Sequence, residues 1–261
     1  MRKIKSNRIV IKIGTNVLTN EKGLLDMNVI RNLVSQIAKI KNHRDIIIIT
    51  SGAIGAGMQE LKLKKRPKDV IGKQVCAAVG QNILMASYHS LFRKYKIKIA
   101  QILLTYKDLT DEETYRNLAN SLHKLFELGV IPIINENDPI SINEIGPSFG
   151  DNDNLSAMIA TKIKADLLVI LTNVDGLYNK NPNEKGAVLI KEVTNIDKNV
   201  EKMGAGSSQL GIGGMKTKLQ AAKTATKAGT TVVIANGRKN DALIETINNK
   251  DIGTVFYPKK K

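Results

Sequence analysis

Short apolar runs alternate with longer amphipathic segments along the whole chain. The run at 46–49 is apolar on both faces, which is typical of buried parallel strands. The pattern predicts strands at 8–13, 45–50, 97–105, 130–135, 167–172, 230–235 and 253–257. It predicts helices at 27–42, 68–95, 112–128, 154–164, 216–228 and 240–248. This alternation of strands and helices favours an α/β fold with a mainly parallel sheet covered on both sides.

One segment departs from this alternation. Residues 179–214 are polar and rich in turn-forming side chains, with one candidate short strand at 187–193. We expect a surface excursion or lid over the sheet edge. We identify no linker and no internal repeat, so the 261 residues are expected to form a single domain spanning 1–261.

The amino-acid composition argues against a membrane protein, a disulfide-bonded protein and a sequence-specific nucleic-acid-binding protein. No apolar run approaches the ~20 residues of a membrane helix, and a single cysteine excludes an internal disulfide framework. We therefore expect a cytoplasmic protein with no membrane partner. The formal charge is +16, but the basic residues are mostly lysines, tryptophan is absent and aromatics are 4%. Base readout usually relies on arginine and aromatic side chains, so no specific nucleic-acid partner is predicted.

Polar and glycine residues follow the carboxyl ends of five predicted strands, where open parallel sheets bind ligands. The densest group is the run of two acids and two amides at 151–154, directly before an apolar helical pattern. Helix capping accounts for one or two of these side chains. We expect one carboxylate to cap the helix and another to face a site rich in cations and amides.

A lysine and two glycine-rich helix entries could bind an anion. Lys12 interrupts an apolar run, where a lysine either meets an anion, enters a cleft or snorkels from a sheet edge. The segments 51–57 and 211–218 place glycines before helices, although neither has dinucleotide-fingerprint or Walker A spacing, and ordinary turns are the alternative. Lys216 and Lys218 diverge by roughly 200° on a helix, so only one can point inward.

Two lysines, two glycine loops and paired carboxylates without a histidine base favour phosphoryl transfer, in which the protein mainly positions and neutralises charge. A carboxylate acceptor fits this set, because a carboxyl with a pKa of about 4.3 is already ionised at neutral pH.

These residues together resemble the amino-acid kinase family over nearly the whole chain. The likeness is carried by residues 11–15, 50–54, 77–81, 134–138, 150–157, 171–178 and 213–218. The motifs Asn-Glu-Asn-Asp, Gly-Asp-Asn-Asp-Asn-Leu-Ser-Ala and Gly-Gly-Met-Lys-Thr-Lys, in this order, are most similar to the branch that phosphorylates glutamate. The resemblance implies a three-layer αβα sandwich around a mainly parallel, eight-stranded sheet. It also implies a form lacking the C-terminal PUA domain that many bacterial relatives carry.

The resemblance also implies roles for individual residues. Lys12 and Lys218 would stabilise the transferring phosphoryl group, and Asp153 would hold their ammonium groups in place. Three positions match glutamate-binding residues: Ser51, Asp138 and Asn152, with Asp138 taking the substrate ammonium. The ATP-contacting positions match Lys12, Thr172, Asn173, Ile212, Gly213, Gly214, Met215, Lys216, Thr217 and Lys218. No residue matches a protein metal ligand.

The implied reaction is ATP-dependent phosphorylation of the γ-carboxylate of L-glutamate to L-glutamyl 5-phosphate, the first step of proline biosynthesis. ATP would be the co-substrate, with Mg²⁺. Family members are usually homo-oligomers, here a dimer or tetramer, and are often inhibited by proline. A glutamate-5-phosphate reductase is the partner that would receive the product.

Alternatives stay open within the same fold: a uridylate, aspartate or N-acetylglutamate kinase. Outside it, the alternative is a non-catalytic module that binds nucleotide or amino acid. Two departures from the family pattern bear on the choice. Asn173 stands where many members carry Asp, and the interval between Asp138 and Asp151 is longer than in some relatives. Proline sensitivity is therefore an open expectation.

Overall fold

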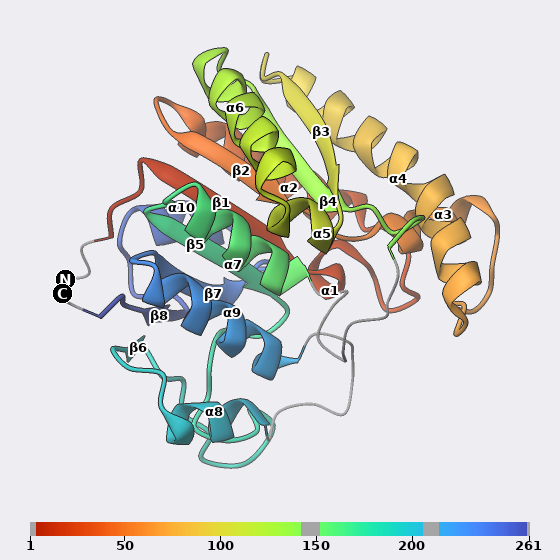
Figure 1. The fold of residues 1–261 in the computed structure, drawn as a ribbon. Coiled ribbons are helices and arrows are strands. Elements are labelled where there is room, and N and C mark those ends of the chain that lie inside the picture. Colours follow the sequence, from red (N-terminus) through yellow and green to blue (C-terminus); the bar gives the residue numbers. More distant parts are fainter. Residues whose placement is uncertain (1–3, 142–151, 206–213, 260–261) are drawn as a thin grey trace.

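An eight-stranded sheet forms the centre of the computed structural model (Figure 1), which describes residues 4–141, 152–205 and 214–259. Its strands are β1 (Arg8–Ile13), β2 (Asp45–Ile49), β3 (Ile99–Leu104), β4 (Ile131–Glu136), β5 (Leu167–Thr172), β6 (Glu192–Val193), β7 (Thr231–Asn236) and β8 (Thr254–Phe256). They lie in the order β3-β4-β2-β1-β5-β7-β8-β6. The pairing of β7 with β8 is antiparallel and the other pairings are parallel. The mainly parallel, eight-stranded sheet is confirmed.

The helices follow the strands in alternation, as predicted. They are α1 (Thr15–Leu18), α2 (Met27–Lys41), α3 (Ala53–Glu60), α4 (Val70–Arg93), α5 (Tyr106–Thr110), α6 (Glu112–Glu127), α7 (Asn152–Lys162), α8 (Lys198–Ala205), α9 (Met215–Lys227) and α10 (Ala242–Ile247). Aspartates at three N-caps accept backbone N–H groups and so mark where α2, α4 and α6 begin: Asp26, Asp69 and Asp111. No helix among the described residues is long and apolar enough to span a membrane.

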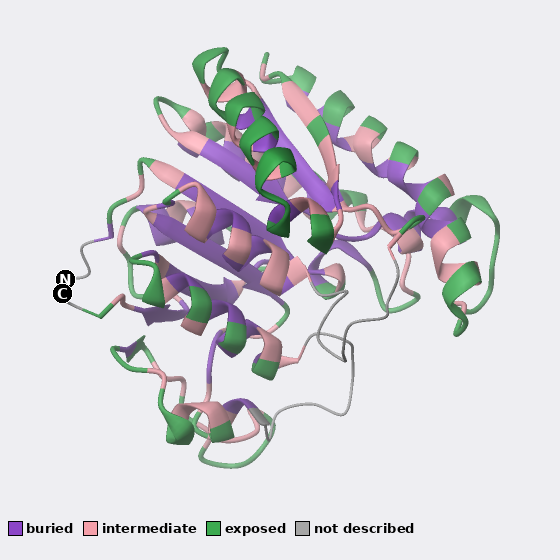
Figure 2. Cartoon of the chain, in the orientation of Figure 1, coloured by how far each residue is buried: buried purple, intermediate pink, exposed green. Residues whose placement is uncertain are grey.

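Alternate side chains of the central strands face two separate cores. Ile9, Ile11 and Ile13 of β1 pack with buried residues of α2, α4 and α10, whereas Val10 packs with those of α7 and α9. Figure 2 shows the sheet as a buried layer between helices whose outer faces are exposed. Full burial stabilises each such apolar side chain by about 1.5–3 kcal/mol. The predicted three-layer αβα sandwich is confirmed.

The excursion at 179–214 contains more structure than its composition indicated. The helix α8 lies within it, and the short strand is limited to the two residues of β6. Val200 and Met203 of α8 pack against the core on the α9 side, while its lysines face outward. The sequence predicted a surface excursion without a helix; α8 forms because one short apolar stripe suffices to dock a helix whose composition is otherwise polar.

Helices α3 and α4 meet backbone to backbone. A Cβ at Gly80 would lie 1.8 Å from the Ala53 carbonyl oxygen, and a Cβ at Gly57 would lie 1.8 Å from that of Cys76. Neither position can therefore carry a side chain unless the helices separate. This contact fixes where α4 lies relative to the carboxyl end of β2.

Candidate active site

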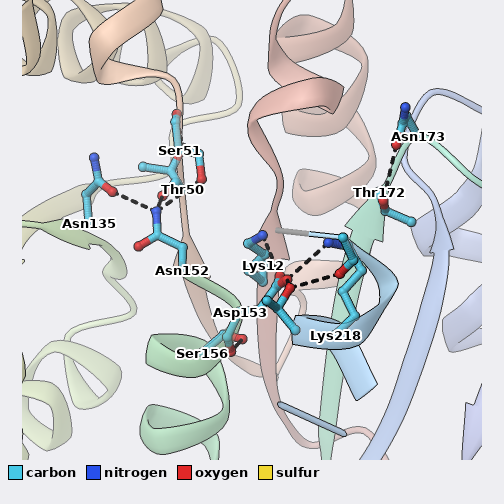
Figure 3. Close-up of polar contacts among 12 residues, drawn as sticks. Lys12, Thr50, Ser51, Asn135, Asn152, Asp153, Ser156, Thr172, Asn173 and Lys218 are labelled. Carbon is cyan, nitrogen blue, oxygen red and sulfur yellow. Dashed lines mark hydrogen bonds and ion pairs between the residues drawn. The ribbon is translucent and has the colours of Figure 1, made fainter. Parts of the chain in front are cut away.

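A buried carboxylate forms ion pairs with two buried lysines near the carboxyl end of the central strand β1 (Figure 3). Asp153 is fully buried at the start of α7, and its oxygens lie 2.5 Å from the Lys12 Nζ and 3.0 Å from the Lys218 Nζ. The Thr217 hydroxyl donates a 2.8 Å hydrogen bond to the same carboxylate. Two ammonium groups thus surround one carboxylate, which leaves net positive charge for an anionic ligand.

The protonation state of Asp153 follows from this contact. Burial alone would raise the pKa of the carboxyl group, but the charges of Lys12 and Lys218 and the hydrogen bonds outweigh it and lower the pKa to about 2. The carboxylate is therefore ionised at neutral pH. A charged Asp153 keeps both lysines in place, which an exposed ion pair would not do reliably.

The local backbone explains why these lysines reach the same point. Lys12 is the penultimate residue of the central strand β1, and Gly14 follows the end of that strand, where a Cβ would lie 3.6 Å from the Lys12 Nζ. Lys218 lies in the first turns of α9 and is 6% exposed, whereas Lys216 on the same helix is exposed. Of the two lysines predicted to diverge on this helix, Lys218 is therefore the inward one.

A second polar group lies on the other side of β1 (Figure 3). Asn152, next to Asp153 on α7, donates from Nδ2 to the Thr50 carbonyl at 2.6 Å, the Ser51 Oγ at 3.0 Å and the Asn135 Oδ1 at 3.0 Å. The structure thus brings together Ser51 and Asn152, which the family resemblance had matched to the amino-acid site. The consecutive residues Asn152 and Asp153 tie this group to the lysine cluster.

Asp138 follows β4 and lines a cavity of about 310 Å³ with Gln81 of α4 and Glu136. Burial, reinforced by the nearby Glu136 charge, raises the pKa of Asp138 to about 7, although Arg66 opposes this shift. Two acidic side chains in one pocket of a strongly basic protein favour a cationic group such as an ammonium.

A third polar group lies beyond β5. The Thr172 hydroxyl donates to the Asn173 Oδ1 at 3.4 Å, and Asn173 is exposed. Two residues on, the Asp175 carboxylate accepts from the Asn236 Nδ2 at 3.0 Å and the Lys239 Nζ at 2.7 Å. An acidic side chain therefore lies at this edge, two residues after Asn173.

Two assigned residues, Ile212 and Gly213, lie outside the described residues, whereas Gly214 is the N-cap of α9 and Met215 is its first residue. Sequence reasoning assigned no role to Asn135, Gln81 or Asp175. Asn135 belongs to the noted Asn-Glu-Asn-Asp run, so its motif was a usable signal. Gln81 and Asp175 also lie in segments that carry the family resemblance, 77–81 and 171–178, but only the fold shows which side chains they meet.

The chain belongs to the amino acid kinase family, whose model matches residues 7–236. It is similar to the glutamate 5-kinase of Clostridium acetobutylicum, with 46% identity over 98% of this chain and 96% of that protein. The glutamate 5-kinase of Clostridium perfringens is 44% identical over 98% and 97% of the two chains. That of Methanosarcina barkeri is 45% identical over 97% of this chain and 69% of its own length.

Solved structures share the fold at low identity. A UMP kinase from Bacillus anthracis superposes with a TM-score of 0.65 at 11% identity, covering 98% of this chain and 97% of that one. A carbamate kinase from Giardia lamblia bound to AMP-PNP gives 0.69 at 17% identity, covering 97% and 98%. At these identities the likeness establishes the architecture alone.

Proposed function

We propose that this chain transfers the γ-phosphoryl group of ATP to the γ-carboxylate of L-glutamate. The observation that carries the proposal is the buried cluster of Lys12, Asp153 and Lys218, which lies between an amide-lined group and the polar edge beyond β5. The relatives that match nearly the whole chain are named for the same reaction. The cluster supplies what phosphoryl transfer needs most, fixed positive charge.

The chemistry follows from the charges. A carboxylate oxygen of glutamate attacks the γ-phosphorus, the bond from that phosphorus to the bridging oxygen breaks, and ADP leaves with the electron pair. The acceptor is ionised at neutral pH, so no general base is required. Repulsion between the carboxylate and the phosphates is the main obstacle. Lys12 and Lys218 offset that repulsion, and Asp153 holds them where charge develops in transfer.

The substrates divide between the two sides of β1. Ser51, Asn152 and Asp138 would hold glutamate, with Asp138 facing its ammonium. Thr172, Asn173 and the start of α9 would hold ATP, whose phosphates suit the N-terminus of a helix that begins after Gly214. Mg²⁺ would enter on the phosphates, as it does in sites that give it few protein ligands. It would neutralise phosphate charge alongside the lysines.

A hydroxylamine-trapping assay tests the proposal. The purified chain receives ATP, Mg²⁺ and, in parallel, glutamate, aspartate, N-acetylglutamate or no acceptor, with ADP release from UMP followed separately. We expect a hydroxamate with glutamate alone. ADP release with UMP and no hydroxamate would replace the substrate but keep the chemistry. No turnover with any acceptor would favour a module that binds without catalysis.

The lability of the proposed acyl-phosphate product indicates what kind of enzyme must act after this one. An acyl phosphate hydrolyses readily, so a reductase that consumes L-glutamyl 5-phosphate is the partner class that the reaction calls for. Inhibition by proline and assembly into a dimer or tetramer belong to the same proposal. Adding proline to the trapping assay and measuring the mass of the protein in solution test them directly.

A further inference from the structure

Three carboxamide side chains form one line of hydrogen bonds beneath the amino-acid side of the site. The Asn152 Nδ2 of α7 donates to the Asn135 Oδ1 of β4 at 3.0 Å, and the Asn135 Nδ2 donates to the Gln81 Oε1 of α4 at 2.8 Å. Asn135 is 3% exposed and Gln81 is 9% exposed. Elements far apart in the sequence are thus joined by a buried polar connection, which we call the amide line.

The direction of the amide line is set at one end by a backbone carbonyl. The Asn152 Nδ2 also donates to the Thr50 carbonyl at 2.6 Å, and a carbonyl oxygen can only accept. Asn152 must therefore turn its amino group toward Thr50. Asn135 must then offer its oxygen to Asn152 and its amino group to Gln81. If one of these three carboxamides turned over, its neighbour in the amide line would lose the hydrogen bond that joins them.

The three hydrogen bonds of Asn152 use its amino group, so its carboxamide oxygen is left as an acceptor. The Oδ1 atom is buried and has no hydrogen-bond partner within the described ranges 4–141, 152–205 and 214–259. Buried polar atoms are normally paired. An oxygen that accepts suits the N–H groups of an ammonium and repels a carboxylate, so Oδ1 is complementary to one end of an amino acid.

We propose that Gln81 is a positioning residue of the amino-acid site. Through Asn135 it holds the Asn152 carboxamide so that Oδ1 stays available to the ammonium of the amino-acid substrate; this rests on the proposed function. The close contact of Gly80 with α3 explains why the Gln81 side chain can reach Asn135. Gly80 is the residue before Gln81, so the contact fixes the position of α4 at this point. Gln81 acts on the substrate through two other side chains and takes no part in phosphoryl transfer.

Two substitutions at one position separate positioning from general packing. Gln81→Met keeps the length of the side chain and removes the acceptor for Asn135. Gln81→Glu retains an acceptor oxygen at the same place. We expect Gln81→Met to raise the KM for glutamate about 3- to 10-fold, the effect of one hydrogen bond, with kcat and the KM for ATP within about twofold. Gln81→Glu should stay within about threefold of the unsubstituted protein when both are measured well above pH 7, where Asp138 is ionised despite the added carboxylate.

Gln36 offers a matched control. It is a buried glutamine on α2 whose Oε1 accepts from the Leu243 backbone N–H at 2.9 Å, and its Nε2, like that of Gln81, has no partner among described residues. Gln36→Met should lower the thermal unfolding temperature as Gln81→Met does but leave the KM for glutamate unchanged. In an Asn135→Ala background, Gln81→Met should add nothing to the KM, because the connection is already broken.

The outcomes distinguish this inference from the proposed function. If the unsubstituted chain forms no glutamyl hydroxamate, the proposed function fails. If it does, an unchanged KM in Gln81→Met overturns the positioning role. An equal rise in Gln36→Met would make the effect one of stability and overturn the inference. An equal rise in Gln81→Glu would also overturn it, because that variant keeps the acceptor for Asn135.

Discussion

The ion pair between Lys12 and Asp153 joins the central strand of the sheet to the first turn of α7, with 2.5 Å between nitrogen and oxygen and neither side chain more than 5% exposed. A pair of the same length joins Lys223 and Glu201 on the surface, where both side chains are more than a third exposed. The two pairs differ in burial, so they allow a comparison of one contact in two environments.

Asp153→Asn keeps the shape of the side chain and removes the charge that two lysines share. We expect kcat for hydroxamate formation to fall at least about 100-fold, because the ammonium groups are no longer held where charge develops. The free energy of unfolding at pH 7 should fall by about 3 kcal/mol, since buried cations lose their counterion. Glu201→Gln is the control and should change stability by less than about 1 kcal/mol. Equal effects of the two substitutions would contradict a special role for the buried cluster.

The stability that Asp153 contributes should depend on pH. Its pKa of about 2 in the folded protein is below the ordinary value of 3.8, so the folded state binds this proton less tightly than the unfolded state. The contribution is complete above about pH 4 and is lost as the pH falls toward 2. Urea unfolding between pH 5 and 2 should show the difference between the unsubstituted chain and Asp153→Asn shrinking. A constant difference over this range would refute the assignment.

Lys218→Ala should reduce kcat about 100-fold or more and change the KM for glutamate little, because its contact strengthens during transfer. Lys216→Ala provides the comparison on the same helix, with an exposed side chain. There we expect kcat to be retained and any effect to be confined to the KM for ATP. Steady-state kinetics with each substrate varied distinguish the two, and weaker glutamate binding at full kcat in Lys218→Ala would remove its catalytic role.

Glutamate binding should tighten as pH rises through neutrality. The pKa of Asp138 is raised to about 7, and only the ionised carboxylate attracts the substrate ammonium. The KM for glutamate should therefore be about tenfold lower at pH 8 than at pH 6, with the KM for ATP as internal reference. Asp138→Asn should give a high KM with no such dependence. A substituted chain that keeps the pH profile would place the titrating group elsewhere.

Two glycine substitutions test the helix contact that positions α4. Gly80→Ala forces a Cβ to within 1.8 Å of the Ala53 carbonyl oxygen, so the helices must separate, and we expect a loss of several kcal/mol or failure to fold. Gly129→Ala meets no atom within 4 Å but has a positive φ of 68°, which should cost about 1 kcal/mol. Thermal unfolding compares them, and similar melting temperatures would contradict the packing argument.

Most strands were predictable because their apolar runs match buried positions, although β3 is only half-buried over most of its length, and Lys12 was identifiable because it interrupts one of these runs. Helix periodicity showed that only one of Lys216 and Lys218 could face inward, but only the fold shows which. The helix α8 was missed because its composition is polar. The amide line was not predictable, because Gln81, Asn135 and Asn152 come from three separate segments and nothing in their spacing indicates that they meet.

The order of the strands in space also bears on synthesis. Strands β1 to β4 and helices α3, α4 and α7, which carry the amino-acid side, are made first, whereas Lys218 arrives with α9, 65 residues after Asp153. Since synthesis proceeds from the N-terminus, the elements of the amino-acid side leave the ribosome before Lys218, the residue that completes the lysine cluster. A polypeptide that has not yet reached Lys218 therefore cannot assemble the charge cluster, and phosphoryl transfer begins only after α9 has been made.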